Sequence, residues 1–530
     1  MSNQAPNNPA NPLSHSTASK RGRAPRELPV RRESNDGYFP LASVGGAFGV
    51  TAELVPYARI VDYQEKRAIP EQGYYRLCRH PVVRRLEARV RALIDVPVVQ
   101  LVHSPGLAAE ELAHFLSLTP GPWSVVEMEG VPERWPEGAT HVVCALAEGV
   151  VRMGLILSRE SDHAPLLWER IRKRGAVPSA RDAALLCGEN PGTEPREKIS
   201  DAICHELRIL SAAPHCSLYP TGMGALVAAV DAMWNPNRPD IAIVGHLYSD
   251  THVLLSEMPW HADMSFRSHF LRADQAESLA ELLADANVGL VFVETITNPL
   301  VEIPNLPRII ELARAAGARV LVDNTMASPA NCRPLELGAH AVVESTTKYL
   351  SGGNDHGGGA VLTDDTAIST RLVAEQGRLA SGMSGFEGEA LMGGMTSYLE
   401  RMPRFNDNGR RMAAFLREHP AVAQVWFPTD DQMAQASHIH GAASVMSFTL
   451  KDGSLEALTR FLETPMSGVY KAPSLGSDVT LLCPYTLLTY FHRDEAYLEE
   501  IRLPRHLLRF SVGCEVEFEP VLDAVRNALD

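Results

Sequence analysis

Short apolar runs rich in β-branched residues alternate with helical patterns in the middle of the chain. Residues 241–244, 288–293 and 319–322 are such runs, and each predicts a buried strand. Between the last two, residues 304–317 have apolar positions at helical spacing, with Pro at the start and Gly at the end. Strand, helix and strand at this spacing predict a βαβ unit in a parallel sheet. Ligands of such sheets gather at the carboxyl ends of the strands.

The pattern changes on both sides of this unit. Amphipathic helices and short apolar bursts precede it, at residues 82–90, 96–102, 141–146, 150–157 and 194–210. They predict a small α/β region, in which no chemical motif is apparent. From about residue 377 onward the pattern is mixed, with strands expected at 444–450 and 507–512, and this predicts a separate C-terminal domain.

The first 36 residues are rich in Asn, Pro, Ser and Arg and hold few large apolar side chains. Such a segment buries too little surface to offset the entropy of ordering it, so we expect a disordered tail. A transit peptide is the alternative interpretation of its basic residues 20–32, and disorder without targeting is the favoured one.

Length and charge narrow the possible partners. A chain of 530 residues is too long for a single core, so two or three domains are expected. The net charge of -15 repels phosphate backbones and anionic lipid, so we expect neither nucleic acid nor a membrane as a partner. The 8 cysteines form no Cys-x-x-Cys pair, which predicts reduced thiols of a cytoplasmic protein and no metal site.

An acidic residue ends one of the predicted strands. Asp323 follows the apolar residues 319–322, so its carboxylate is expected to project into the ligand crevice of the sheet. A carboxylate in that position can keep a pyridinium nitrogen protonated, which makes the ring an electron sink. A helix cap is the alternative role for an Asp at the end of a strand.

A lysine follows several hydroxyl side chains and precedes glycines in the run Ser345-Thr346-Thr347-Lys348-Tyr349-Leu350-Ser351-Gly352-Gly353. This arrangement fits an amine that binds a cofactor covalently beside a phosphate. Lys348 forms the imine in this interpretation, and the hydroxyls of Ser345 and Thr347 bind phosphate oxygens. The alternative is a lysine on a solvated loop.

Three further segments have features of ligand sites. Gly222, Met223 and Gly224 lie in a glycine-containing turn that leads into a helix, and such a turn can bind an anion through free N–H groups. Residues 294–299, Glu-Thr-Ile-Thr-Asn-Pro, end another predicted strand. Arg509 lies in an apolar run, where a buried charge needs an anionic partner such as a carboxylate. Alone, the glycine turn is better explained as an ordinary capped helix start. The alternative for residues 294–299 is a polar turn, and that for Arg509 is an internal salt bridge.

Together, the segments TGM, ETITNP, VDNT, STTKY and RFSVG resemble the Cys/Met-metabolism enzymes that use pyridoxal 5′-phosphate (PLP). Within that family, the long N-terminal half and the segments TGM, APSLG (472–476) and CPYT (483–486) most resemble the fungal-type cystathionine γ-synthases. The resemblance covers roughly Tyr74 to the C-terminus. It implies the fold-type I architecture: an α/β protein with a mostly parallel central sheet, helices on both faces and a smaller α+β C-terminal domain. We therefore divide the chain into a disordered tail (1–36), an N-terminal α/β region (37–200), a PLP-binding domain (201–376) and a C-terminal domain (377–530).

The resemblance also implies roles for individual residues. Lys348 is the Schiff-base lysine and moves protons, Asp323 pairs with the pyridine nitrogen, and Tyr248 stacks on the ring as a candidate base. The residues expected at the phosphate are Thr221, Gly222, Met223, Ser345, Thr347 and, from a neighbouring subunit, Tyr74 and Arg76. Arg509, Ser474 and Asn298 are expected to bind the substrate α-carboxylate. The family usually has Tyr-Gly-Gly-Thr where this chain has residues 248–251, Tyr-Ser-Asp-Thr.

From this resemblance we expect γ-replacement, in which an O-acylated homoserine reacts with cysteine to give cystathionine, by a homo-oligomer built as a dimer of dimers. The alternatives are a γ-lyase acting on methionine or cystathionine, an O-acylhomoserine sulfhydrylase, and a relative that forms carbon–carbon or carbon–nitrogen bonds. A non-catalytic scaffold is disfavoured because Lys348 and Asp323 are both present.

Overall fold

The computed structural model describes residues 79–530 except Pro120, residues 257–264 and Ala286. It also describes short pieces of the preceding segment: residues 38–39, 43–44, 46–48, 51–52, 60, 64 and 69–70. The predicted disordered tail and the predicted phosphate ligands Tyr74 and Arg76 lie outside the described residues.

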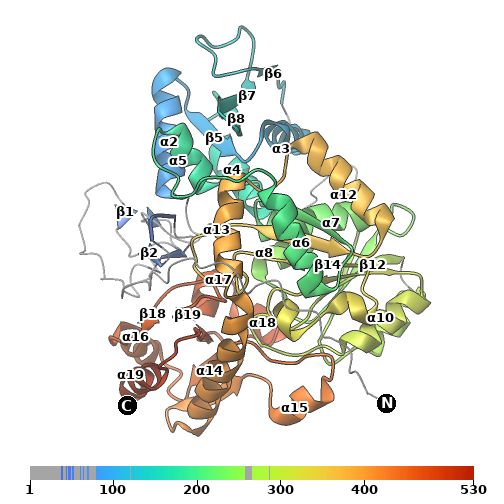
Figure 1. Cartoon of the computed structure of the whole chain (residues 1–530), viewed down its shortest axis with the longest axis vertical. Coiled ribbons are helices and arrows are strands. Elements are labelled where there is room, and N and C mark those ends of the chain that lie inside the picture. Colours follow the sequence, from blue (N-terminus) through green and yellow to red (C-terminus); the bar gives the residue numbers. More distant parts are fainter. Residues whose placement is uncertain are drawn as a thin grey trace, which may run out of the picture.

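A seven-stranded sheet forms the centre of the molecule (Figure 1). Its strands are, in spatial order, β11 (Ser268–Leu271), β10 (Asp240–Val244), β12 (Val288–Glu294), β13 (Arg319–Asp323), β14 (Ala341–Glu344), β15 (Gly359–Thr363) and β9 (His215–Tyr219). Neighbouring strands are parallel except at β15, which is antiparallel to both β14 and β9. The predicted strands of the βαβ unit are β12 and β13, and α10 (Leu306–Ala315) is its helix.

Alternate residues of these strands belong to two separate cores. On β12, Val291 and Val293 pack with α6 (Ile199–Ser211) and α10, whereas Leu290 and Phe292 pack with α7 (Gly222–Met233) and α12 (Thr366–Leu379). The period of two along a strand sends successive side chains to opposite faces. Helices therefore cover both faces of the sheet, which explains why its strands are apolar throughout.

The N-terminal region, at the top of Figure 1, is a second α/β unit. Its mixed sheet has the order β5 (Val98–Val102), β8 (Val151–Ser158), β7 (His141–Glu148) and β6 (Val125–Met128). Leu155 and Leu157 of β8 pack with α2 (Pro81–Leu93) and α5 (Ala180–Leu186). Ile156 faces the other way, toward α3 (Pro105–Leu118) and α4 (His163–Lys173).

The C-terminal part, at the bottom of Figure 1, contains a five-stranded sheet. Its order is β16 (Val422–Trp426), β17 (Val445–Leu450), β20 (Leu508–Ser511), β19 (Thr480–Pro484) and β18 (Val469–Tyr470). The strands are antiparallel apart from the β18–β19 pair. Its side chains share a core with the long helix α14 (Tyr398–Glu418) and with α16 (Leu455–Glu463) and α19 (Glu519–Leu529).

Helix α6 begins at Ile199, five residues after the position expected from the sequence. The backbone N–H and the guanidinium of Arg196 both bind Glu389 of α13 (Gly385–Met395), at 3.0 and 2.7 Å. This segment therefore lies along α13 before the helix starts, and the cap residue Lys198 has a left-handed φ of 62°. Pro195 precedes the helix instead of lying in its first turn.

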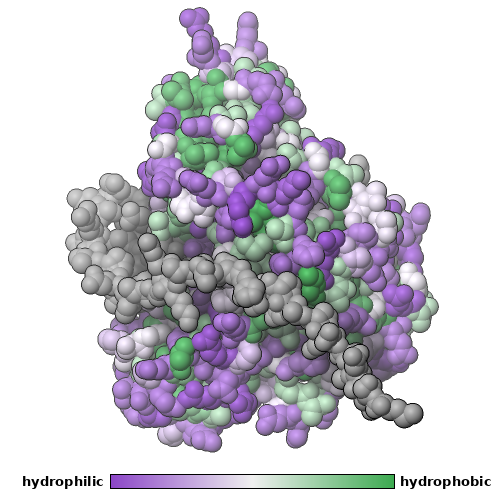
Figure 2. Space-filling view, in the orientation of Figure 1, coloured by the Kyte–Doolittle hydropathy of each residue, from purple (hydrophilic) through white to green (hydrophobic). Residues whose placement is uncertain are grey.

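Hydrophilic side chains cover most of the face shown in Figure 2, and apolar side chains gather chiefly over the N-terminal region. Among the described residues, no helix combines the length and the apolar character needed to cross a bilayer.

Candidate active site

One cavity of about 160 Å³ opens at the carboxyl ends of the central strands. Glu294 at the end of β12, Asp323 at the end of β13 and Glu344 at the end of β14 line it. The first turn of α7 closes one end, and residues of the C-terminal sheet close the other. This is the edge at which ligands of parallel sheets bind.

The structure brings together the residues that the sequence singled out, apart from Tyr74 and Arg76. The cavity is lined by Thr221, Gly222, Met223, Tyr248, Asn298, Asp323, Ser345, Thr347, Lys348, Ser474 and Arg509. These residues lie far apart in the sequence, from Thr221 to Arg509. The structure shows that these residues line one cavity, and the role of each residue stays a prediction.

Lys348 is buried beside a strained turn. Its Nζ donates a hydrogen bond of 2.9 Å to the hydroxyl of Ser474. Ser474 has a φ of 102°, a conformation that costs a residue with a Cβ atom about 1–3 kcal/mol and is concentrated at functional sites. A Cβ atom on the nearby Gly476 would lie 2.6 Å from the backbone nitrogen of Tyr349, so glycine allows the turn to approach the lysine segment.

Three carboxyl groups crowd the ends of the strands. Burial raises the pKa of Asp323, whose Oδ1 accepts a hydrogen bond of 2.9 Å from the backbone of Thr325. In the described part of the chain no basic side chain forms an ion pair with Asp323. Burial and the charge of Asp323 raise the pKa of Glu294 well above its usual range, and burial raises that of Glu344 to about 8. A cationic ring nitrogen next to Asp323 would balance this charge.

Glu294 also positions two neighbours in the cavity. It accepts hydrogen bonds from the backbone N–H groups of Tyr248, at 2.6 Å, and of Asn298, at 3.1 Å. The residue that ends β12 therefore fixes both the candidate ring-stacking tyrosine and the amide that contacts Arg509.

The end of the cavity at α7 is suited to a phosphate. Thr221 caps the helix by accepting a hydrogen bond of 2.9 Å from the N–H of Gly224, which leaves the N–H groups of Gly222 and Met223 for a ligand. A Cβ atom on Gly222 would lie 3.0 Å from the Cβ of Ser345. The absence of a side chain at Gly222 therefore lets the helix terminus approach Ser345. The predicted phosphate ligand Thr347 also lines the cavity, but its hydroxyl is bonded to the backbone of Gly358, at 3.3 and 3.1 Å.

Arg509 lies at the opposite end, fixed by neutral partners. It donates to Oδ1 of Asn298 at 2.9 Å and to the backbone oxygen of Ser474 at 2.8 Å, and it lies 4.9 Å from the ring centre of Tyr485. Among the described residues no carboxylate forms an ion pair with it. A buried guanidinium with this set of partners suits an anionic substrate group such as a carboxylate. The cavity thus holds the amine of Lys348, the carboxyl group of Asp323, an end suited to a phosphate and an arginine suited to a carboxylate. Together these groups fit PLP and an amino-acid substrate.

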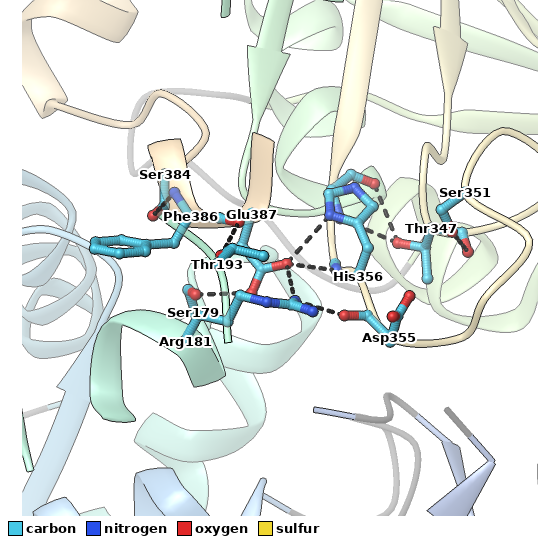
Figure 3. Close-up of polar contacts among 12 residues, drawn as sticks. Ser179, Arg181, Thr193, Thr347, Ser351, Asp355, His356, Ser384, Phe386 and Glu387 are labelled. Carbon is cyan, nitrogen blue, oxygen red and sulfur yellow. Dashed lines mark hydrogen bonds and ion pairs between the residues drawn. The ribbon is translucent and has the colours of Figure 1, made fainter. Parts of the chain in front are cut away.

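A buried glutamate connects the segment that follows Lys348 to the N-terminal region (Figure 3). Glu387 of α13 accepts hydrogen bonds from Ser179 Oγ (2.9 Å), Arg181 (3.0 Å), His356 Nδ1 (3.2 Å) and the Gly357 N–H (3.2 Å). The other ring nitrogen of His356 lies 2.9 Å from the hydroxyl of Thr346. Burial alone would raise the pKa of Glu387, but the charge of Arg181 and the hydrogen bond from His356 lower it to about 2.

Sequence reasoning missed several residues of the site. Arg172 and Gly175 of the N-terminal region, and Asp250 and Glu344, also line the cavity. The run of residues 169–174, Glu-Arg-Ile-Arg-Lys-Arg, has the composition of a solvated helix face, so its sequence gave no sign of Arg172. Asp250 could have been recognised from the sequence, because it is an acidic residue only two positions after the candidate tyrosine, Tyr248.

We predict that Glu387→Gln lowers the free energy of unfolding by about 3 kcal/mol at pH 7, because it removes the carboxylate from a buried network. The pKa of Glu387 in the folded protein lies below its ordinary value of 4.5. Its stabilising effect is therefore complete above pH 4.5 and is lost as the pH falls toward 2. Urea unfolding at several pH values checks this, and the difference between wild type and variant should narrow below pH 4.5.

Glu389→Gln is the matched control, two residues along the same helix. It removes a pair with Arg196, whose side chain is 64% exposed, so a loss of at most about 1 kcal/mol is expected. Equal losses for the two variants would contradict the importance of the buried network.

The chain is similar to a known family of enzymes. The family model of Cys/Met metabolism PLP-dependent enzymes matches residues 196–530. Cystathionine gamma-synthase of Mycobacterium tuberculosis is 30% identical over 301 residues, 56% of this chain and 75% of that protein. Cystathionine gamma-lyase of Bacillus subtilis is 28% identical over 317 residues, 59% of this chain and 81% of that protein.

Among solved structures, cystathionine gamma synthase from Xanthomonas oryzae pv. oryzae in complex with cystathionine is similar, with a TM-score of 0.58 and 29% identity. The similarity covers 63% of this chain and 86% of that one. The predicted fold class and PLP dependence are thereby confirmed, although these relatives carry both synthase and lyase names. Because the family model covers more than half of the sequence, this chain belongs to the Cys/Met metabolism family of PLP-dependent enzymes.

Proposed function

We propose that this enzyme catalyses γ-replacement, in which an O-acylated homoserine and cysteine give cystathionine and a carboxylate. The observation that carries amino-acid chemistry is the contact of one residue, Ser474, with both Lys348 and Arg509. A carboxylate on Arg509 holds the α-carbon of an amino acid near the lysine. The choice of the synthase reaction is supported by relatives of that name and by the similarity to a synthase structure with cystathionine.

PLP, when bound, supplies an electron sink that makes the hydrogens on the α-carbon, and then on the β-carbon, acidic. In this scheme Lys348 moves these protons between the substrate carbons, because it is the amine nearest the carboxylate site. Asp323 keeps the ring nitrogen cationic. Asn298 orients Arg509 through their hydrogen bond of 2.9 Å.

Removal of the second proton lets the bond between the γ-carbon and the acyl oxygen break, and the acyl group leaves as a carboxylate. The sulfur of cysteine then bonds to the γ-carbon. The hydroxyl of Tyr248 accepts the thiol proton while it donates its own proton to Oδ2 of Asp250, 3.1 Å away, from which the proton passes to solvent. If no thiol adds, hydrolysis gives a 2-oxo acid and ammonia, which is γ-elimination.

A γ-lyase is the second candidate, supported by the similarity to the Bacillus subtilis cystathionine gamma-lyase. The residues that bind the α-carboxylate and move protons serve both reactions. Access of a thiol, as opposed to water, to the γ-carbon therefore decides between them.

The assembly and location that we propose are those of the family resemblance, a cytoplasmic homo-oligomer arranged as a dimer of dimers. In such an assembly Tyr74 and Arg76 of one subunit reach the phosphate of another. Light scattering coupled to size-exclusion chromatography measures the number of subunits directly.

The reaction is tested with the purified, PLP-loaded enzyme and O-succinyl- or O-acetylhomoserine, each with and without cysteine, by mass spectrometry of cystathionine and 2-oxobutyrate. We expect cystathionine that depends on cysteine, with little oxo acid. Oxo acid formed irrespective of cysteine would make the enzyme a lyase.

Lys348→Ala is expected to abolish the cofactor absorbance that borohydride bleaches and to lower turnover by at least about a thousandfold, because the amine is removed. Lys451→Ala, at an exposed position in the bend that follows β17, is the control and should keep both properties. A Lys348→Ala protein that retains a borohydride-sensitive linkage would refute the assignment of the lysine.

A further inference from the structure

The N-terminal region contributes a cation to the cavity. Arg172, near the end of α4, has its NH1 nitrogen 2.7 Å from Oδ2 of Asp250, and its side chain is 12% exposed. Arg172 lines the cavity, yet it precedes residue 196, where the match to the family model begins. Among the described residues, Asp250 is the acceptor that holds it. A guanidinium carries five N–H donors, so donors remain for a ligand in the cavity.

The chain after Arg172 is packed against the first turn of α7. The hydroxyl of Thr221 donates a hydrogen bond of 2.9 Å to the backbone oxygen of Gly175. Gly175 has a φ of 71°, and a Cβ atom there would lie 2.2 Å from that hydroxyl and 2.3 Å from the nitrogen of Gly224. Glycine is therefore required at this position for α4 to end beside the phosphate end of the cavity.

Asp250 is held at the same end. It lies in the first turn of α8 (Ser249–Ser256), next to Thr251, whose hydroxyl lies 3.9 Å from the sulfur of Met223. Met223 is in the first turn of α7. The Arg172–Asp250 pair thus belongs to the end of the cavity at which backbone N–H groups are free.

Among the described residues of one chain, Arg172 is the basic side chain that lines the cavity beside the first turn of α7. The other basic side chains that line the cavity, Lys348 and Arg509, both bond to Ser474. A phosphate monoester carries a charge of about −1.5 to −2 at pH 7, whereas a helix N-terminus supplies about +0.5. Arginine binds phosphate with paired N–H donors in a fixed plane.

We propose that Arg172 binds the phosphate of PLP within its own chain, held in position by Asp250. The N-terminal region is then a component of the cofactor site, and a subunit carries a phosphate-binding arginine of its own. The proposal requires PLP but is independent of whether the reaction is replacement or elimination. The distal carboxylate of an acyl donor has the same oxyanion chemistry, and the experiment distinguishes it from the phosphate.

The test measures the dissociation constants of PLP and of pyridoxal, which lacks the phosphate, by absorbance titration of the cofactor-free enzyme. For Arg172→Gln we expect PLP to bind about 10- to 100-fold more weakly, the loss of one charged hydrogen-bonded contact, while pyridoxal binds as to the wild type. Lys173→Gln is the matched control. It breaks a 2.8 Å pair with Glu169 on the same helix, away from the lining of the cavity, and should change neither constant.

Two outcomes overturn the proposal. Equal weakening of PLP and pyridoxal would mean that Arg172 supports the fold of the site and not the phosphate. Unchanged PLP affinity, with a KM that rises for O-succinyl- but not for O-acetylhomoserine, would assign Arg172 to the distal carboxylate of a substrate.

A conservative variant covers the case in which Arg172→Gln does not fold. Arg172→Lys keeps a positive charge beside Asp250 but loses the planar pair of donors. It should weaken PLP several-fold and leave pyridoxal unchanged, and PLP binding equal to that of the wild type would again overturn the proposal.

Discussion

Three acidic residues end neighbouring parallel strands, and the rest of the site is arranged around their charge. Glu294 is in register with Asp323, and Asp323 is in register with Val343, directly before Glu344. Parallel strands end at one edge, so the sheet itself brings the carboxyl groups together. The negative charge of Asp323 adds to burial in raising the pKa of both glutamates. A cationic ring beside Asp323 would offset this crowding of negative charge, and PLP supplies such a ring.

Much of this arrangement was predictable from local sequence. The strands β10, β12 and β13 were expected within one residue of their observed ends, because β-branched apolar runs bounded by polar residues have few alternatives. Asp323, Lys348 and Arg509 each contrast with an apolar or hydroxyl-rich neighbourhood. They were therefore recognisable as candidates before the structure brought them to one cavity.

The contributions of the N-terminal region were not predictable, because they arise from tertiary burial. Arg170 and Arg174 pair with Glu111, a side chain with no exposed surface, at 2.8 and 2.9 Å. In the sequence these arginines look like the polar face of an exposed helix. Because α3 packs against α4, the side chains of Arg170 and Arg174 are buried. Arg172, which lies between these two arginines in the sequence, lines the cavity instead. Which face of a charged helix is buried depends on its partner, and a single sequence does not specify the partner.

The strained turn at Ser474 has a consequence for how the ligands influence each other. Its hydroxyl receives the amine of Lys348, and its backbone oxygen receives the guanidinium of Arg509. When cofactor engages the lysine, this hydroxyl loses its donor, and the same turn carries the backbone oxygen that orients Arg509. Ser474 is therefore the residue through which the two binding equilibria would be coupled, and such coupling is reciprocal: any change that the cofactor makes in substrate affinity is matched by an equal change that the substrate makes in cofactor affinity. Through such coupling, the substrate as well as the protein would determine how tightly the cofactor is held during turnover.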